Sequence, residues 1–187
     1  MTTLPKIIGL VGPSGAGKSE TARVLVNTHG YRLAPMAGPL KKMLMAGGLH
    51  HSDVYGARKE TPNTLLGGRT PRHAMQTLGT EWGRGMIHPD IWVNMWVNAY
   101  ERVTRITHTA SALQPVVVDD VRFENEVVAI HKLGGVIIKV ARQGVYYSTA
   151  HDSERGVSAA MVDYVVFNTG DLIHLKREVD NCLYVLS

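Results

Sequence analysis

The stretch Gly12-Pro13-Ser14-Gly15-Ala16-Gly17-Lys18-Ser19 determines how this chain is expected to fold. It matches the phosphate-binding pattern G-x-x-x-x-G-K-[ST], and it lies between an apolar run at 7–11 and a helix-favouring segment at 20–26. Its glycines allow positive φ angles and bring successive backbone N–H groups close to a phosphate. A strand, a loop and a helix in this order predict a site for a nucleoside triphosphate.

Two side chains of this loop are expected to carry most of its chemistry. Lys18 can place its charge on the β- and γ-phosphates, and the Ser19 hydroxyl can ligate a Mg²⁺ ion that bridges them. The N-terminus of the following helix adds partial positive charge. We therefore expect a bound nucleoside triphosphate with Mg²⁺ as cofactor. The residues expected to contact ATP here are Gly12, Ser14, Gly15, Ala16, Gly17, Lys18, Ser19 and Glu20.

Length favours a single domain. The 187 residues are 44% apolar, which is enough for one substantial core over 1–187. The formal net charge is +4, but the basic residues are dispersed, so phosphate-bearing small molecules explain it more simply than a nucleic acid. The single cysteine, Cys182, excludes an internal disulfide and is expected to be a small apolar filler in the last helix.

The chain shows no feature expected of a membrane protein. It begins without the hydrophobic region of a signal peptide, and it contains no run of 18 apolar residues. We therefore expect a cytoplasmic protein with no membrane partner. Assembly as a homodimer is compatible with the sequence, which does not determine the oligomeric state.

A second informative stretch, at 69–84, is expected to be helical. On a helix of 3.6 residues per turn, one face would carry Arg72, Gln76, Gly79, Thr80 and Gly83. Arg72 could bind a phosphate in bidentate geometry and Gln76 a base edge or ribose, while the glycines would leave space for a planar ring. This arrangement suits an acceptor site, but a solvated amphipathic helix is the alternative. Trp92, in the next helix, could be core or could wall that site.

Three further segments complete the pattern. Residues 50–70 are rich in Gly, Pro, Asn, Thr and basic residues, which indicates a long loop or mobile flap. The apolar strand at 115–120 ends in Asp119 and Asp120, which could orient Mg²⁺ or simply cap the strand end. The polar segment at 142–155, flanked by arginines, could close over ATP or be a solvated loop whose Ser153 caps a short helix.

With these residues in view, the chain resembles the bacteriophage deoxynucleoside monophosphate kinases, over nearly its whole length. The parts that carry the resemblance are the phosphate loop, Arg72-x-x-x-Gln76-x-x-Gly79-Thr80-Glu81, Asp120-Val121-Arg122-Phe123 with Glu126, His151-x-Ser153-Glu154, and the segment from Asp163 to Asn168-x-Gly170. The first and last recur in related kinases, whereas the Arg72 cluster points to the deoxynucleotide branch. Thr149 stands where the family often has an acid.

The resemblance implies a fold, a reaction and a set of roles. The fold is the three-layer α/β/α architecture of P-loop NTPases, with a five-stranded parallel sheet, an acceptor-binding helical insertion at about 39–105 and a lid at about 142–158. The reaction is transfer of the ATP γ-phosphate to a deoxynucleoside monophosphate. The implied catalytic residues are Lys18, Arg122, Arg142 and Arg155; the acceptor contacts are Arg69, Arg72, Gln76, Gly79, Thr80, Trp92, Asp120 and Arg122; the metal ligands are Ser19 and Asp120. Asn168 and Gly170 would lie near the adenine of ATP.

Two other functions remain open from sequence alone. One is a different small-molecule kinase of the same fold, such as a dephospho-coenzyme A kinase. The other is a nucleotide-dependent binding switch without transfer activity. The accepted bases, the exclusion of ribonucleotides, the role of residues 50–68 and the choice between the lid arginines are not determined by the sequence.

Overall fold

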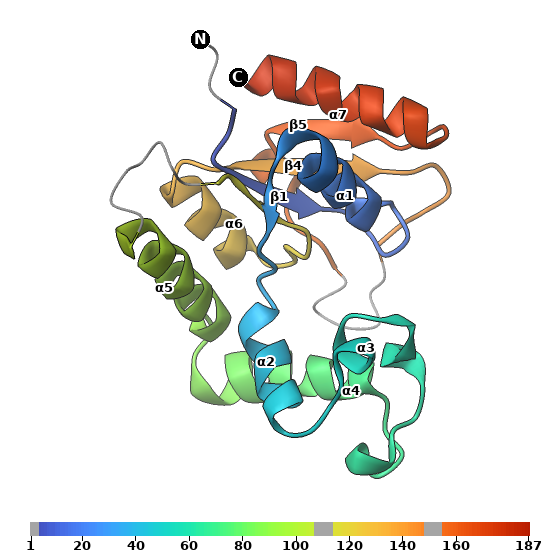
Figure 1. The fold of residues 1–187 in the computed structure, drawn as a ribbon, viewed down its shortest axis with the longest axis vertical. Coiled ribbons are helices and arrows are strands. Elements are labelled where there is room, and N and C mark those ends of the chain that lie inside the picture. The colour runs from blue at the N-terminus through green and yellow to red at the C-terminus, as the bar shows by residue number, and fades with distance from the viewer. Residues whose placement is uncertain (1–3, 107–113, 148–154) are drawn as a thin grey trace. The chain divides into compact units, whose positions relative to one another are not determined.

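The computed structural model describes residues 4–106, 114–147 and 155–187 (Figure 1). The chain divides into two compact units. The first, which we call the phosphate-loop unit, comprises Met1–Met36 and Glu101–Ser187. The second, the helical unit, comprises Ala37–Tyr100. Each is described by itself below.

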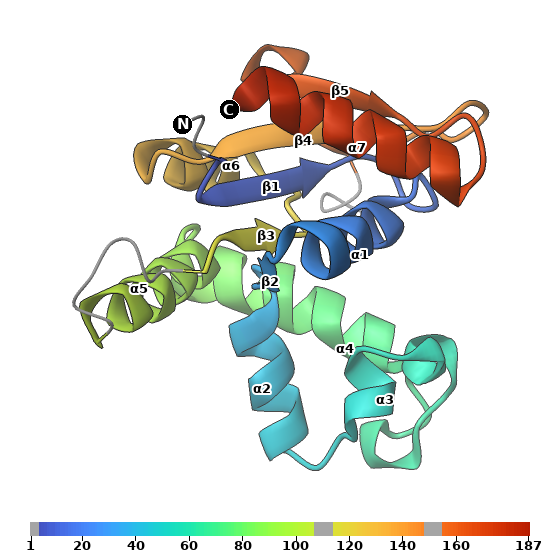
Figure 2. The ribbon, with the colours of Figure 1, turned by 45° about the horizontal axis from the view of Figure 1, so that its top comes forward.

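The phosphate-loop unit is built on a five-stranded sheet whose strands are all parallel (Figure 2). The strand order is β2-β3-β1-β4-β5. The strands are β1 Ile7–Val11, β2 Arg32–Leu33, β3 Val116–Val118, β4 Val136–Ala141 and β5 Tyr164–Phe167. The predicted five-stranded parallel sheet is therefore confirmed.

Helices cover both faces of this sheet, as its apolar strands require. Helices α1 (Lys18–His29) and α7 (Leu172–Leu186) pack on one face, and α6 (Glu124–Lys132) packs on the other (Figure 2). A short helical turn, η6 (Ala159–Met161), precedes β5. Gly9 shows how closely α6 approaches, because a Cβ there would lie 2.8 Å from the Ile130 Cδ1 atom. The three-layer α/β/α architecture is thereby confirmed.

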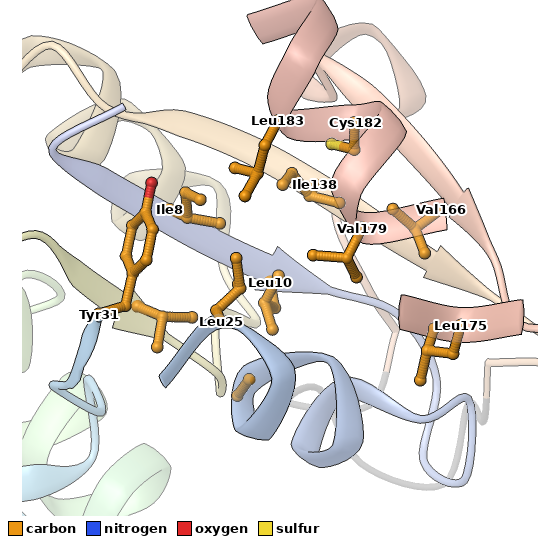
Figure 3. Close-up of a cluster of buried hydrophobic side chains, with 12 residues drawn as sticks. Ile8, Leu10, Leu25, Tyr31, Ile138, Val166, Leu175, Val179, Cys182 and Leu183 are labelled. Carbon is orange, nitrogen blue, oxygen red and sulfur yellow. The ribbon is translucent and has the colours of Figure 1, made fainter. Parts of the chain in front are cut away.

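The core between the sheet, α1 and α7 also holds two ionisable groups (Figure 3). The Tyr31 hydroxyl donates to the Pro5 carbonyl at 2.7 Å, and burial raises the pKa of this phenol. Cys182 is fully buried, and burial raises the pKa of its thiol to about 12. The prediction that Cys182 is an apolar filler is confirmed.

The helical unit consists of short helices. They are α2 (Gly38–Ala46), α3 (His51–Val54), η1 (Ala57–Glu60), η2 (Thr64–Leu66), α4 (Pro71–Gln76), η3 (Thr77–Ile87) and the Ile91–Tyr100 part of α5 (Ile91–Ile106). The expectation of a loop without regular structure at 50–70 is wrong, because three helical turns occupy it. No helix in the described parts of the chain combines the length and hydropathy needed to cross a membrane.

Side-chain caps explain those unexpected turns. Asp53 accepts a hydrogen bond from the His50 backbone N–H at 2.9 Å, at the start of α3. The Asn63 side-chain Oδ1 atom accepts from the Leu65 N–H at 2.9 Å and caps η2. Turns of three or four residues are too short to show hydrophobic periodicity, so their sequence reads as loop.

Candidate functional site

The phosphate loop has a backbone conformation that its glycines make accessible. Gly12, Gly15 and Gly17 have φ angles of 144°, 82° and 106°, a range that residues with a Cβ rarely adopt. Gly17 is also the N-cap of α1, where it supplies no side-chain oxygen to the first N–H groups of the helix. Those N–H groups can therefore donate hydrogen bonds to an anion.

The loop is held against the ends of two neighbouring strands. A Cβ on Gly12 would lie 2.4 Å from the Val140 carbonyl oxygen in β4. A Cβ on Gly17 would lie 2.3 Å from the Asn168 Nδ2 atom, just beyond β5. Val145, in the turn after β4, comes within 3.9 Å of the equivalent position on Gly15. The loop is thus fixed by its surroundings as well as by its own sequence.

Asn168 takes a specific part in holding the loop. Its Nδ2 donates to the Ala16 carbonyl at 2.9 Å, and its backbone N–H donates to the Ala141 carbonyl at 2.8 Å. Gly170 permits close contact with α7, because a Cβ there would lie 2.8 Å from the His174 Cβ. The predicted position of this turn near adenine is not tested, but Asn168 directly contacts the phosphate loop.

Lys18 lies over the loop that it is expected to serve. Its Nζ donates to the carbonyls of Gly12 at 2.6 Å and Pro13 at 2.9 Å. Ser14 and Ser19 are exposed, so the loop is accessible to solvent. Glu20, in the first turn of α1, forms an ion pair with Arg23. An ammonium held by neutral carbonyls can exchange them for phosphate oxygens, which bind it more strongly.

Asp120 lies at the edge of the sheet where the phosphate loop begins. Gly9 pairs with Val118, the last residue of β3, so Asp120 follows at the sheet edge where β1 leads into the phosphate loop. The Asp120 Oδ1 atom accepts from the Met36 N–H at 2.7 Å. A carboxylate has lone pairs for a further ligand, and Mg²⁺ commonly takes one or two protein oxygens with phosphates and waters. The donor set of Ser19 and Asp120 therefore fits Mg²⁺ chemically.

Arg122 follows Asp120 and is fixed through its backbone. Glu126 is 4% exposed, and its Oε2 accepts from the N–H groups of Arg122 at 2.7 Å and Phe123 at 3.1 Å. This buried carboxylate starts α6 and sets the chain direction at Arg122. The Arg122 residue itself is half-buried.

The segment predicted to form a lid is described only in part. Residues 148–154, including Thr149, His151, Ser153 and Glu154, lie outside the described residues. Arg142 is exposed at the end of β4, in the turn that brings Val145 to the phosphate loop. Arg155 is exposed, and the Gly156 beside it contacts the Tyr147 ring, which would lie 2.5 Å from a Cβ there. Whether either arginine reaches a nucleotide stays a prediction.

In the helical unit, α4 carries the pair expected to bind the acceptor. Thr70 caps α4 by accepting from the His73 N–H at 3.2 Å, and Pro71 occupies its first turn. Arg72 and Gln76 are one helical turn apart and half-buried. Arg72 Nε donates to the Glu60 Oε1 atom of η1. Arg69, before the helix, is exposed.

The helix after Gln76 departs from the predicted face. Residues 77–87 form a π-helix, with i→i+5 hydrogen bonds such as His88 N–H to Gly83 O at 3.0 Å. Each turn therefore contains more than 3.6 residues, and Gly79 and Gly83 rotate away from the Arg72 face that α-helical geometry predicts. The inference that Gly79 and Gly83 share one face with Arg72 is wrong for this reason.

Gly79 and Gly83 both contact Trp92. The indole of Trp92 is 2% exposed, and its Nε1 donates to the Gly79 carbonyl at 2.7 Å. A Cβ on Gly83 would lie 2.6 Å from the Trp92 ring. Trp92 therefore fills the space beside Gly83, which supports the core alternative for Trp92. Acceptor contacts of Gly79 and Trp92 stay predictions. Thr80 is half-buried, and its role stays a prediction.

A second acid and arginine pair supports η1. The Asp53 side chain is 4% exposed, and its Oδ1 lies 3.0 Å from the Arg58 Nε atom. Both residues border a pocket of about 410 Å³ formed within residues 48–65. The sequence analysis assigned no role to Asp53 or Glu60. The partners of these two carboxylates depend on how α3, η1 and α4 pack, and no local sequence pattern predicts that packing.

Comparisons with known proteins agree with this geometry. The family model described as deoxynucleotide monophosphate kinase matches residues 69–179. A putative deoxynucleotide monophosphate kinase of Acanthamoeba polyphaga mimivirus is 32% identical over 184 residues, covering 95% of each chain. The deoxynucleotide monophosphate kinase of Escherichia phage RB69 is 26% identical over 141 residues, covering 74% of this chain and 56% of the relative. That of Enterobacteria phage T4 is 29% identical over 115 residues, covering 62% and 46%. The chain thus spans about half the length of the two phage relatives.

Proposed function

Because the chain belongs to the deoxynucleotide monophosphate kinase family, we propose that it transfers the γ-phosphate of ATP to a deoxynucleoside monophosphate, giving ADP and the diphosphate. The observation that carries this proposal is the phosphate loop, with three glycines at positive φ fixed against β4 and Asn168. The proposed partners are ATP and the monophosphate, without nucleic acid. A cytoplasmic location and a homodimer belong to the same proposal.

The reaction needs no general base. The attacking group is a phosphate oxygen of the acceptor, which is largely ionised at neutral pH because its second pKa is about 6. Catalysis then consists of aligning two phosphates in line and neutralising the charge that keeps them apart. These are tasks for fixed N–H groups and cations.

This chain supplies both kinds of group. The backbone N–H groups of residues 14–19 would surround the ATP phosphates, and Lys18 would exchange its two loop carbonyls for phosphate oxygens. Ser19 and Asp120 would hold Mg²⁺, which when bound would neutralise charge on the same phosphates. Arg122, Arg142 and Arg155 are proposed to stabilise charge on the transferring group. Arg69, Arg72 and Gln76 are proposed to bind the acceptor.

The experiment is a coupled assay of ADP release with each of the four deoxynucleoside monophosphates. Their ribonucleotide counterparts and dephospho-coenzyme A serve as comparison acceptors. We expect release of ADP to depend on at least one deoxynucleotide and to stop when EDTA removes divalent cations. Stimulation by dephospho-coenzyme A alone would show a different small-molecule kinase, and slow ADP release that no acceptor changes would show a binding switch.

A further inference from the structure

We propose that Glu60 positions Arg72 for the acceptor phosphate, which makes Glu60 a positioning residue in the segment at 50–70. The inference rests on the proposed function and extends it. The observation is the ion pair from Arg72 Nε to Glu60 Oε1, which joins η1 to α4. Nothing in the sequence pattern around Glu60 marks it for this role.

The choice of nitrogen matters for what Arg72 can still bind. A guanidinium has five N–H donors in a planar fork, and Glu60 engages the one on Nε. Among the described residues, Arg72 makes no other side-chain hydrogen bond. The two terminal nitrogens therefore remain for a ligand, and their parallel N–H groups match two oxygens of a phosphate. Glu60 fixes the plane of the guanidinium without occupying that end.

Glu60 is itself held in place by the packing of η1. The buried Asp53 carboxylate receives the His50 N–H at 2.9 Å and lies 3.0 Å from Arg58 Nε, so it links the start of α3 to η1. Gly56 lets η1 pack closely on α3, because a Cβ there would lie 2.6 Å from the Ser52 carbonyl oxygen. Two carboxylates in succession therefore connect α3 to η1 and η1 to α4.

The Glu60 pair is too exposed to be a large stability term. The side chains of Arg72 and Glu60 are 33% and 56% exposed, and exposed ion pairs contribute about 0–1 kcal/mol to folding. Replacing Glu60 should therefore leave the fold intact. Its effect should appear where the orientation of Arg72 matters, which is in binding of the acceptor.

The test compares Glu60→Ala and Glu60→Gln with wild type. We expect Glu60→Ala to raise the Michaelis constant for deoxynucleoside monophosphates about three- to tenfold, with kcat and the Michaelis constant for ATP within twofold. Glu60→Gln, whose amide oxygen can still accept from Nε, should recover part of the loss. In an Arg72→Ala background, Glu60→Ala should add no further loss.

Asp180→Asn is the matched control. It removes one exposed carboxylate that pairs with His29 in the phosphate-loop unit, and so it changes the net charge equally. We expect no change in acceptor binding. A similar loss in this control would mean a general charge effect and would overturn the inference. Unchanged acceptor binding in Glu60→Ala would do the same, and a lower Michaelis constant would show that Glu60 competes with the phosphate.

Calorimetric titration with dTMP, dGMP, dCMP and dAMP separates this inference from the proposed function. It measures acceptor binding by wild type and the Glu60 variants without turnover. Wild type that binds an acceptor but transfers no phosphate would contradict the proposed function, while the variants still decide the role of Glu60. Wild type that binds none of the four contradicts both.

Discussion

The phosphate loop and the α4–η3 segment differ in how much of their geometry is local. In the loop, the glycines, Lys18 and Ser19 occupy the positions that a short pattern assigns to them, and Asn168 and Val140 support the loop from adjoining strand ends. In the α4–η3 segment, the same kind of pattern reading fails after Gln76, because a π-helix changes the period and Trp92 fills the space beside Gly83. A sequence pattern therefore predicts local geometry well where backbone conformation determines it, as in the phosphate loop. It predicts poorly where packing between side chains of different helices determines the geometry, as in the α4–η3 segment.

The largest effect should come from the side chain that defines the loop. Lys18→Ala should lower phosphoryl transfer at least a hundredfold, because a charge on the β- and γ-phosphates is lost in a preorganised site. The fold should be unaffected, since Lys18 is half-buried in the loop and is not among the buried core side chains. The measurement is kcat/KM with circular dichroism on the same samples, and Lys176→Ala on α7 is the control. A folded variant with more than a tenth of wild-type activity would contradict the proposed role.

Gly83→Ala tests the packing explanation for the second region. A Cβ would lie 2.6–2.7 Å from three Trp92 ring atoms, and such overpacking costs about 1–3 kcal/mol of unfolding free energy. Gly79→Ala is the matched control, because its nearest contact is the Leu40 Cδ2 atom at 3.5 Å. All three tryptophans lie in the helical unit, so urea unfolding followed by tryptophan fluorescence reports it directly. Unchanged stability with weakened acceptor binding in both variants would restore the ligand-space interpretation.

The two units should also differ at alkaline pH. Among the described residues, all the side chains with a raised pKa belong to the phosphate-loop unit. They are Tyr31, Tyr147 and Cys182. The pKa of the Cys182 thiol is about 12 in the folded state and 9.0 in the unfolded state. Between pH 9 and pH 12 the folded state therefore binds more protons than the unfolded state. Stability from this group is therefore full below pH 9 and is lost as pH rises towards 12.

Cys182→Ala measures that contribution. We expect its unfolding free energy, taken from urea midpoints at pH 8, 9, 10 and 11, to fall less steeply with pH than that of wild type. The physical reason is that the substitution removes the thiol whose ionisation favours the unfolded state. Parallel pH curves for the two proteins would show that the Cys182 thiol does not contribute.

The smallest effect concerns base preference. Gln76→Ala should change the Michaelis constants of the four deoxynucleotides unequally, by a few fold, because an amide can read a base edge. Initial rates against acceptor concentration give these constants. An equal change for all four would show that Gln76 contacts a part common to every acceptor, and no change would exclude it from the site.

Particular residues show how far the sequence could predict this molecule. The apolar strands, the loop and β5 could be predicted, because burial and backbone conformation leave a direct mark on residue type. The caps that fold residues 50–70 and the Glu60–Arg72 pair could not, because they join elements of three or four residues that carry no periodic signal. The fit of Trp92 to Gly83 is likewise a property of packing between two helices. Resemblance supplied Asn168, and the structure added its contact with Ala16.

The most direct test of the account is whether donor and acceptor depend on different regions. Arg72→Ala should raise the Michaelis constant for every accepted deoxynucleoside monophosphate at least tenfold, a loss of about 1.4 kcal/mol or more, because all of them share the phosphate. The Michaelis constant for ATP, measured in the same assay at saturating acceptor, should change less than twofold. Unchanged acceptor constants, or a large loss confined to ATP, would contradict the assignment of acceptor binding to α4.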